Sequence, residues 1–373
     1  MKLTLVIHSL TLGGAERVMS IMANYWVDKR WKITILTFDD GSIPPVFHLD
    51  SRVCHIPLGL AVDSINSIDA IWQNFQRVRF LRQAIIQSKP HVVISFIDTT
   101  NVMTLLATRQ LNIPVVVSER TDPAFSSSRQ RKIWVHLRRW TYPQANRLVV
   151  QSQGAYNYFP PQVQVITSII PNPVLIPVLS ESGEHTIRKR LSVPCIMAMG
   201  RLLEVKGFDL LLQAFAKVKD HHPQWSLTIL GEGQLRSQLE LLSHQLGIYG
   251  RVFMPGLANN VYEFLQQADI FVMSSRYEGF PNALCEAMAC GLAVISTDCP
   301  SGPREIIRHG IDGILVENEN VEALASAMDR LMSDEQERKE LAAKALEVIE
   351  RFSLEKVMGM WEQVLNQVIE EKL

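Results

Sequence analysis

The 373-residue sequence lacks the features that define several simpler classes of protein. Its five cysteines are odd in number and form no CxxC pair, which argues against a disulfide framework or zinc site and fits a reducing cytosol. No run approaches the 18 or more apolar residues that span a bilayer. The apolar part of Met1–Ile7 is too short for a signal peptide. We expect a cytosolic protein that begins with a buried strand.

Neither sign of charge dominates the whole chain, whose net charge is −1, but the distribution is uneven. Residues 1–180 hold 18 Lys/Arg against 10 Asp/Glu, and the remainder holds 19 against 28. A basic first half predicts contact with an anionic surface or ligand. The apolar fraction of 47% is typical of a globular protein, and the length favours two domains.

Short β-rich runs alternate with helical patterns throughout the first half. Strands are predicted at Leu3–His8, Lys32–Phe38, Val92–Phe96, Pro114–Ser118 and Arg147–Gln151. Helices are predicted at Ala15–Asp28, Asp69–Ser88, Thr99–Gln110 and Ser128–Tyr142. This alternation predicts a parallel sheet covered by helices on both faces. The proline-rich Ile169–Val174 and the polar Ser180–Glu184 then indicate a domain boundary.

The second half restarts the same pattern. Strands are predicted at Cys195–Gly200, Ser226–Leu230, Val252–Met254, Ile270–Met273, Ala293–Ser296 and Gly313–Val316, and helices at Gly207–Val218, Gln234–Leu246, Asn259–Ala268 and Asn282–Ala289. We therefore expect an α/β protein of two doubly wound Rossmann-like domains, residues 1–175 and 176–355, with a ligand crevice at the carboxyl ends of the strands. Residues 356–373 are expected to form a helix that returns to the first domain.

Two glutamates, Glu278 and Glu286, form the most informative pair in the chain. Gly279 and Pro281 keep the first in a loop, while helix-forming residues from Asn282 onward place the second in the first turns of a helix. N–H groups at a helix N-terminus attract phosphates and hydroxyl-rich ligands because they have no intrahelical partner. The pair therefore predicts a pocket for a ribose or a pyranose. The alternative is a solvated helix end.

Glycine-containing loops follow several of the predicted strands. Arg201 and Lys206 lie between Gly200 and Gly207, and two cations at a helix start can bind a diphosphate. Surface solvation is the alternative. Gly13-Gly14 follows the first strand and can bring the backbone close to a diphosphate, or it forms only a turn; it lacks the third glycine of a nicotinamide-binding loop.

Two further loops of the second half carry candidate binding groups. Glu232 lies between two glycines that can leave room for a nucleobase. Arg304 ends the run Asp298–Arg304, in which Ser301–Pro303 can present backbone amides beside this cation. For this loop too, a purely structural role is the alternative.

A basic segment, Arg129–Trp140, is expected to form a helix with a cationic face and aromatic anchors. This pattern predicts contact with an anionic membrane, with a solvated helix and a nucleic-acid site as the other readings. We favour the membrane and expect no nucleic-acid partner. The predicted membrane-facing residues are Arg129, Arg131, Lys132, Trp134, Arg138 and Arg139.

Taken together, these motifs resemble those of the retaining glycosyltransferases of family 4, which have the GT-B fold of two domains facing across a cleft. The resemblance covers nearly the whole chain and rests on Gly13–Glu16, Ile170–Val174, Gly200–Gly207, Leu230–Gly233 and Glu278–Glu286. Ser118–Pro123 and Cys299–Arg304 resemble the bacterial branch that extends polyprenyl-diphosphate-linked glycans with UDP-sugars.

The resemblance implies that Arg201 and Lys206 hold the donor diphosphate, that Glu278 contacts the donor sugar and that Glu286 binds the nucleotide ribose. The other implied donor contacts are Gly13, Gly14, Glu232, Gly279, Phe280, Asn282, Ala283 and Leu284. Many family members carry a His where this chain has Glu119-Arg120. Glu119, Arg120 and Arg304 are therefore candidates for donor or acceptor contact.

The resemblance also implies a metal-independent transfer in which the nucleotide-sugar is a co-substrate and no cofactor takes part. The first domain would bind a glycan acceptor linked to a polyprenyl diphosphate, and the enzyme would lie at the inner face of the plasma membrane. A non-catalytic nucleotide-sugar-binding protein on the same fold is the competing hypothesis. The complete set of Arg201, Lys206, Glu278 and Glu286 argues against it, since a binder need not keep a whole transfer site.

Overall fold

The computed structural model describes residues 1–373 except residues 12, 62–66, 125–128, 177–193, 259 and 373. The side chains of residues 67–71 and 129–132 also lie outside the description. The chain divides into two compact units, residues 1–172 with 355–373, and residues 173–354. Each unit has a parallel sheet and a core of its own, so each is described by itself.

The N-terminal unit is built on a seven-stranded parallel sheet in the order β3-β2-β1-β4-β5-β6-β7. Its central strands are nearly continuous apolar runs, as strands buried on both faces require; every residue of β4, for example, is buried. The strands are β1 (Lys2–Ile7), β2 (Lys32–Thr37), β3 (Cys54–Pro57), β4 (Val92–Phe96), β5 (Val115–Ser118), β6 (Arg147–Val150) and β7 (Thr167–Ile169).

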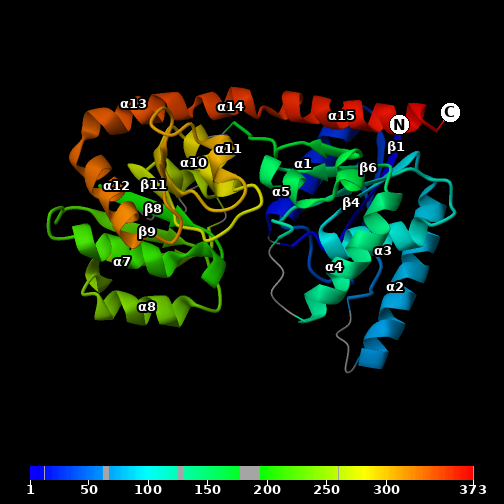
Figure 1. The fold of residues 1–373 in the computed structure, drawn as a ribbon, viewed down its shortest axis with the longest axis horizontal. Helices are drawn as coiled ribbons and strands as arrows, with labels where there is room; N and C mark the ends of the chain where they lie inside the picture. The colour runs from blue at the N-terminus through cyan, green and yellow to red at the C-terminus, as the bar shows by residue number, and fades with distance from the viewer. Residues whose placement is uncertain (12, 62–66, 125–128, 177–193, 259, 373) are drawn as a thin grey trace. The chain divides into compact units, whose positions relative to one another are not determined.

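Helices cover both faces of this sheet (Figure 1). They are α1 (Gly14–Asp28), α2 (Ser67–Ser88), α3 (Asp98–Thr108), α4 (Arg129–Thr141), α5 (Gln153–Tyr158), α6 (Pro161–Gln164) and α15 (Leu354–Glu370). Helix α3 packs between α2 and α4, so these three helices form one layer. Helix α15 packs against this unit: its buried Trp361 meets Phe96 of β4 at 6.2 Å between ring centroids, and Glu362 pairs with Lys29 at 2.8 Å.

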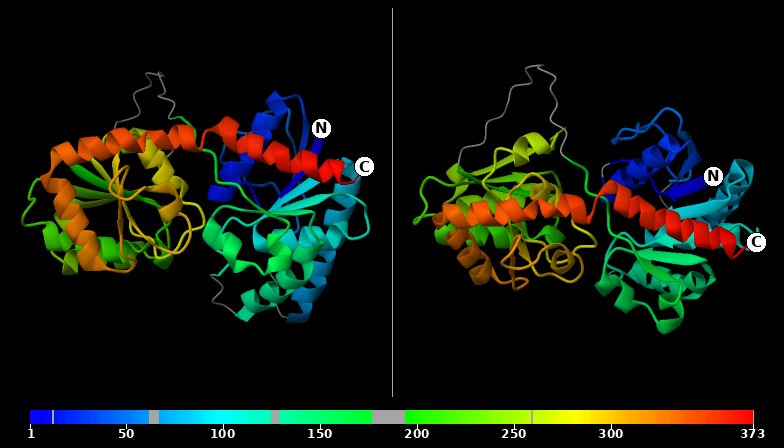
Figure 2. Two further views of the ribbon diagram at one scale, coloured as in Figure 1. Left: turned by 45° about the horizontal axis from the view of Figure 1, so that its top comes forward. Right: turned by 90° about the horizontal axis from the view of Figure 1, so that it is seen from above.

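The C-terminal unit has a six-stranded parallel sheet in the order β10-β9-β8-β11-β12-β13. The strands are β8 (Cys195–Met199), β9 (Ser226–Leu230), β10 (Val252–Gly256), β11 (Ile270–Met273), β12 (Ala293–Thr297) and β13 (Ile314–Val316). The helices are α7 (Phe208–Val218), α8 (Arg236–Gln245), α9 (Tyr262–Leu265), α10 (Asn282–Ala289), α11 (Pro303–Ile306), α12 (Val321–Ser333), α13 (Glu335–Ala345) and α14 (Glu347–Arg351). Figure 2 shows the sheet between its helices from two directions.

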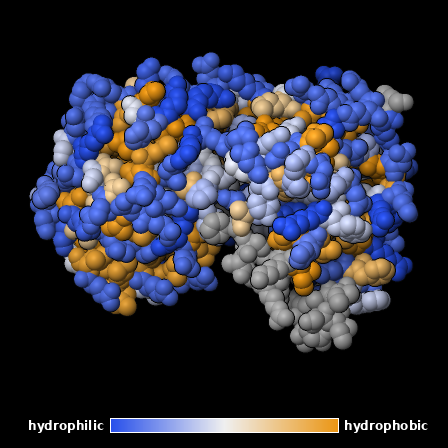
Figure 3. Space-filling model, viewed as in Figure 1, coloured by the Kyte–Doolittle hydropathy of each residue, from blue (hydrophilic) through white to orange (hydrophobic). Residues whose placement is uncertain are grey.

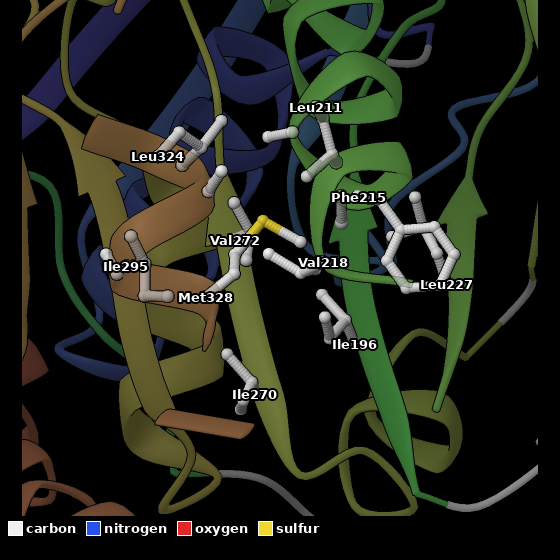
Figure 4. Packing of buried hydrophobic residues seen from close by; sticks show 14 of the residues in the cluster. Ile196, Leu211, Phe215, Val218, Leu227, Ile270, Val272, Ile295, Leu324 and Met328 are labelled. Carbon is white, nitrogen blue, oxygen red and sulfur yellow. The ribbon is translucent and has the colours of Figure 1, made fainter. Parts of the chain in front are cut away.

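On one face of the C-terminal sheet, an apolar core lies between the strands and helices α7 and α12 (Figure 4). Phe215 of α7 and Met328 of α12 are fully buried against strand residues such as Ile196 and Val272. Burying side chains of this size stabilises a fold by roughly 1.5–3 kcal/mol each. This packing holds the strands rigidly, and therefore also the loops at their carboxyl ends.

The structure confirms the predicted α/β class with two doubly wound parallel sheets. All eleven predicted strands are present, whereas β3 and β7 were not predicted because these edge strands contain no buried residue and lack an apolar run. In place of the predicted helix Asn259–Ala268 the structure has the shorter α9. The first residue of the predicted helix, Asn259, lies outside the described part of the chain. The polar stretch Ser180–Glu184 also lies outside it.

Candidate functional site

The loops that carry candidate binding residues in the C-terminal unit meet at the carboxyl edge of its sheet. Strands β8 and β11 are neighbours there, and the strand order reverses between them. Ligands of open α/β sheets bind at such a switch point. The loop after β8 carries Arg201 and Lys206, and the loop after β11 carries Glu278. The fold therefore brings Glu278 to the same edge as two cations that precede it by more than seventy positions in sequence.

Lys206 and Glu278 form an ion pair across this switch point. The distance from Lys206 Nζ to Glu278 Oε1 is 2.6 Å, and the two side chains are 24% and 11% exposed. Ser275 Oγ donates a second hydrogen bond to the same oxygen at 2.6 Å. Within the described residues Glu278 Oε2 has no hydrogen-bond partner. This oxygen can accept a hydrogen bond from a ligand hydroxyl.

Buried hydroxyl groups hold the two loops in place around the pair. Ser274 Oγ donates to the Lys206 carbonyl at 2.9 Å, and Thr297 Oγ1 of β12 donates to the Ser275 carbonyl at 2.6 Å. All three hydroxyl residues are about 1% exposed. None of the three is predicted from the sequence, although two serines directly after a buried strand are a usable signal. They position the ion pair through the backbone.

Two glycines allow the loops to approach so closely. Gly207 adopts a left-handed conformation with φ of 60°, and a Cβ there would lie 2.0 Å from the Ser274 carbonyl oxygen. A Cβ at Gly231 would lie 1.9 Å from the Gly200 carbonyl oxygen. Both clashing atoms belong to the backbone and cannot rotate away as a flexible side chain could. The glycines are therefore required by contact between the loops as well as by backbone conformation.

Arg201 is the exposed cation of the site. Within the described part of the chain its guanidinium makes no ion pair or hydrogen bond, whereas its backbone carbonyl accepts from Leu203 N–H at 2.7 Å. The next residue, Leu202, donates its N–H to the Glu232 carbonyl at 2.9 Å and ties this loop to the one after β9. The loop is thus fixed while the guanidinium is free to bind an anion.

Helix α10 begins where the sequence predicts it, directly after Pro281. Its first N–H groups have no acceptor within the helix, as at any helix N-terminus. Glu286 lies in its second turn and is 9% exposed. Asn282 and Ala283 are partly exposed beside it, whereas the Phe280 side chain is buried against Phe352.

Leu284 is a correction to the predicted donor contacts. Its side chain is fully buried in the core, and its N–H donates to the Pro281 carbonyl at 3.1 Å. The apolar side of a short helix must face the sheet, so this residue has neither a side chain nor an amide for a ligand.

Two other predicted residues already have charged partners. Glu232 pairs with Arg236 at 2.9 Å, one turn further along the chain. Arg304 is 76% exposed and pairs with Asp298 through two nitrogens, Nε being 3.0 Å from Oδ1. Exposed pairs of this kind contribute little to stability because water and salt screen them, so either can reorganise around a ligand.

The glycine pair of the N-terminal unit lies at the start of α1, with Gly14 as the first helical residue. A Cβ at Gly13 would come within 2.1 Å of Glu16 Oε2, which shows that this carboxylate folds back over the glycine. A carboxylate is favoured there by the helix dipole. At the neighbouring switch between β1 and β4, Ile97 has φ of 77°, which is strained for a β-branched residue.

Glu119 and Arg120 are buried at the carboxyl end of β5 and point to different partners. Glu119 Oε1 accepts from Tyr142 Oη at 2.6 Å and from Arg138 at 3.3 Å, and burial raises the pKa of Glu119 to about 7. Arg120 stacks on Phe96 with its guanidinium carbon 3.6 Å from the ring centroid, and burial lowers its pKa to about 9. Neither side chain is exposed to a ligand in this conformation.

The predicted membrane-facing residues of α4 differ in how exposed they are in the structure. Arg138 is a correction, because it is buried and donates to Glu119, the Pro123 carbonyl and Tyr158. Trp134 is partly buried and packs on the core of the unit, and its membrane contact stays a prediction. Arg139 is exposed as predicted. The side chains of Arg129, Arg131 and Lys132 lie outside the description.

Comparison with solved structures defines the class of this fold. Sucrose-phosphate synthase from Thermosynechococcus elongatus matches with a TM-score of 0.85 at 18% identity, over 99% of both chains. HepE from Anabaena, in complex with UDP and glucose, matches with a TM-score of 0.79 at 20% identity, over 98% of this chain and 100% of that one. The fold is GT-B, as the sequence predicts.

Sequence comparison then gives the family. The model of glycosyl transferases group 1 matches residues 185–348, and that of the glycosyl transferase 4-like domain matches residues 13–165. The chain is 29% identical over 370 residues, 99% of each chain, to the GalNAc-alpha-(1->4)-GalNAc-alpha-(1->3)-diNAcBac-PP-undecaprenol alpha-1,4-N-acetyl-D-galactosaminyltransferase of Campylobacter jejuni. The chain therefore belongs to the glycosyltransferases that these two models describe, which confirms the predicted resemblance.

Proposed function

We propose that this glycosyltransferase moves a sugar from a UDP-sugar to a glycan carried on a polyprenyl diphosphate, with retention of anomeric configuration. The observation that carries the proposal is the set of Arg201, Lys206 and Glu278 at the switch point of the C-terminal sheet. Two cations and a carboxylate with an unused oxygen suit a ligand that has both a diphosphate and sugar hydroxyls.

The proposed reaction depends on stabilising the leaving diphosphate. Arg201 and Lys206 neutralise the charge that develops as the bond from the anomeric carbon to the diphosphate oxygen breaks. Glu278 orients the sugar through its hydroxyls, and Glu286 binds the ribose. The acceptor hydroxyl attacks from the face on which the diphosphate leaves, a phosphate oxygen takes its proton, and the new bond keeps the original configuration. The side chains named here need no metal or cofactor for these roles.

The choice of substrates is supported by similar proteins. The Campylobacter relative is named for transfer of N-acetylgalactosamine to a PP-undecaprenol-linked glycan, and HepE is named as a complex with UDP and glucose. We infer a UDP-activated hexose or N-acetylhexosamine as donor. An acceptor anchored in a lipid would place the enzyme at the cytoplasmic surface of the plasma membrane, as a peripheral protein.

A donor screen tests the proposal. Purified protein would be assayed with UDP-GalNAc, UDP-GlcNAc, UDP-glucose, UDP-galactose and GDP-mannose, each with and without a polyprenyl-diphosphate-linked glycan and with EDTA. We expect acceptor-dependent UDP release with one donor, unaffected by EDTA, and thermal stabilisation by UDP alone. NMR of the product would give the anomeric configuration.

Each step of the proposal can fail separately in this screen. Stabilisation by a nucleotide-sugar without release under any condition would support the non-catalytic binding protein. Release that disappears with EDTA would contradict metal independence, and an inverted product would contradict the reaction path.

A further inference from the structure

An apolar stripe runs along the outer face of α2. Trp72 and Phe75 are 60% and 57% exposed, and their rings stack with centroids 6.0 Å apart. Arg79 and Ile86, also exposed, follow on the same face of the helix because they lie seven and fourteen residues after Trp72. Figure 3 shows apolar residues among hydrophilic ones at the surface of this part of the unit. An exposed aromatic pair of this kind indicates an interaction site.

Helix α4 extends this surface on the other side of α3. Ile133 and Trp140 are 63% and 51% exposed and lie seven residues apart on one helical face. The guanidinium of Arg109, which follows α3, lies 5.5 Å from the Trp140 ring centroid. Arg82 of α2 donates to two carbonyls at the end of α3, both at 2.8 Å. The three helices thus form one connected layer, whose outer face we name the α2–α4 surface.

Cations outnumber acids on this layer. Residues 67–147 contain twelve Lys/Arg and four acids, one of which, Asp69, has its side chain outside the described residues. Of the acids, Glu119 and Asp122 are buried and Asp98 is partly buried. Among the described side chains of this layer, the exposed aromatic and aliphatic residues therefore share their surface with cations and with no fully exposed acid. A second copy of the chain would bring the same cations against these, and like charges at an interface are unfavourable.

We propose that the α2–α4 surface docks on an anionic phospholipid membrane, with Trp72 and Phe75 entering the headgroup region and Arg79 contacting lipid phosphates. The proposal deepens the proposed function, because the acceptor inferred above is anchored in a lipid. It differs from the surface expected from sequence. Arg138 is buried and Trp134 is partly buried, and the most exposed aromatic anchors include Trp72 and Phe75 of α2.

Vesicle flotation with the full chain tests the proposal without reference to activity. The variant would be Trp72→Ala/Phe75→Ala, and the matched control Phe253→Ala, which removes a 43% exposed aromatic from β10 of the other unit. Vesicles of phosphatidylglycerol and of phosphatidylcholine would be compared. We expect wild type and control to bind phosphatidylglycerol alike, and the double variant to lose at least about tenfold in partitioning. Binding to phosphatidylcholine should be weak for all.

Other results would overturn the inference. These are equal flotation of the double variant and the wild type, binding that does not distinguish the two lipids, or a concentration-dependent dimer that disappears in the double variant. Circular dichroism would verify that the variants are folded. Nucleotide release with a water-soluble acceptor should be unchanged in the double variant, and its absence in the wild type would count against the proposed function and not against membrane docking.

Discussion

Lys206 holds the central position in the candidate site, because its ammonium pairs with Glu278 while its backbone is tied to Ser274. Lys206→Ala removes a charge without disturbing the buried hydroxyls. We expect turnover to fall by at least about a hundredfold, the scale of one lost electrostatic stabiliser. The control is Lys217→Ala, which removes an exposed lysine paired with Glu322 in the same unit. Turnover close to normal in Lys206→Ala would contradict the proposed role.

The close contact between two loops of the site requires a residue without a side chain at Gly231. Gly231→Ala would place a Cβ 1.9 Å from the Gly200 carbonyl oxygen, so we expect a loss of about 2 kcal/mol or more in unfolding free energy. Gly359→Ala, in helix α15, meets no atom within 4 Å and should be neutral or stabilise by up to about 1 kcal/mol. Urea unfolding of both variants measures the difference. Equal midpoints would show that the loops can separate without cost.

The buried carboxyl group of Glu119 should make the unfolding free energy of the protein depend on pH. Burial raises its pKa from 4.5 to about 7, so its contribution to stability is complete below about pH 4.5 and is lost as the pH rises through 7. Glu119→Gln stays neutral and can still accept the Tyr142 hydrogen bond. We expect its unfolding free energy to fall less between pH 5 and pH 8 than that of the wild type, by up to about 3 kcal/mol. Parallel pH profiles would mean that Glu119 ionises normally.

At the scale of elements, helix α15 is an amphipathic helix whose apolar side is well buried. Trp361 is 1% exposed and meets Phe96, so Trp361→Ala should cost about 3–5 kcal/mol in unfolding free energy. Its neighbour Met360 is 39% exposed, and Met360→Ala should cost less than about 1 kcal/mol. Chemical unfolding compares the two. Similar losses would indicate that the helix is only loosely attached.

Helix α4 shows why a basic pattern does not reveal which cations face outward. The sequence places several cations within thirteen residues, and all were expected at a membrane. The structure turns Arg138 inward to Glu119 because a buried carboxylate needs a charged or hydrogen-bonding partner. A partner nineteen residues away and on another element cannot be identified from helical spacing alone.

At the scale of the whole molecule, the five cysteines are all free thiols with different accessibility. Cys54 is exposed, whereas burial raises the pKa of Cys290 to about 11 and that of Cys299 to about 12. We expect one thiol per chain to react rapidly with a maleimide at pH 8, and five after denaturation. Cys54→Ser should abolish the rapid reaction. Rapid labelling of two or more thiols in the native chain would contradict this burial.

No helix among the described residues has both the length and the apolar content to cross a bilayer. Among the same residues, no three His, Cys, Asp or Glu side chains are grouped as metal ligands would be. The membrane contact proposed above rests on the α2–α4 surface, and vesicle binding is the measurement that decides it.

The sequence by itself determined the periodic features of this protein. Alternation of apolar strands and helical segments defined the two doubly wound sheets, and the glycine and charged residues after predicted strands defined the loops of the site, since these patterns are local. Only the tertiary structure decided which charges meet. It paired Lys206 with Glu278 and turned Arg138 and Leu284 inward, because such contacts join residues whose proximity depends on strand order and packing.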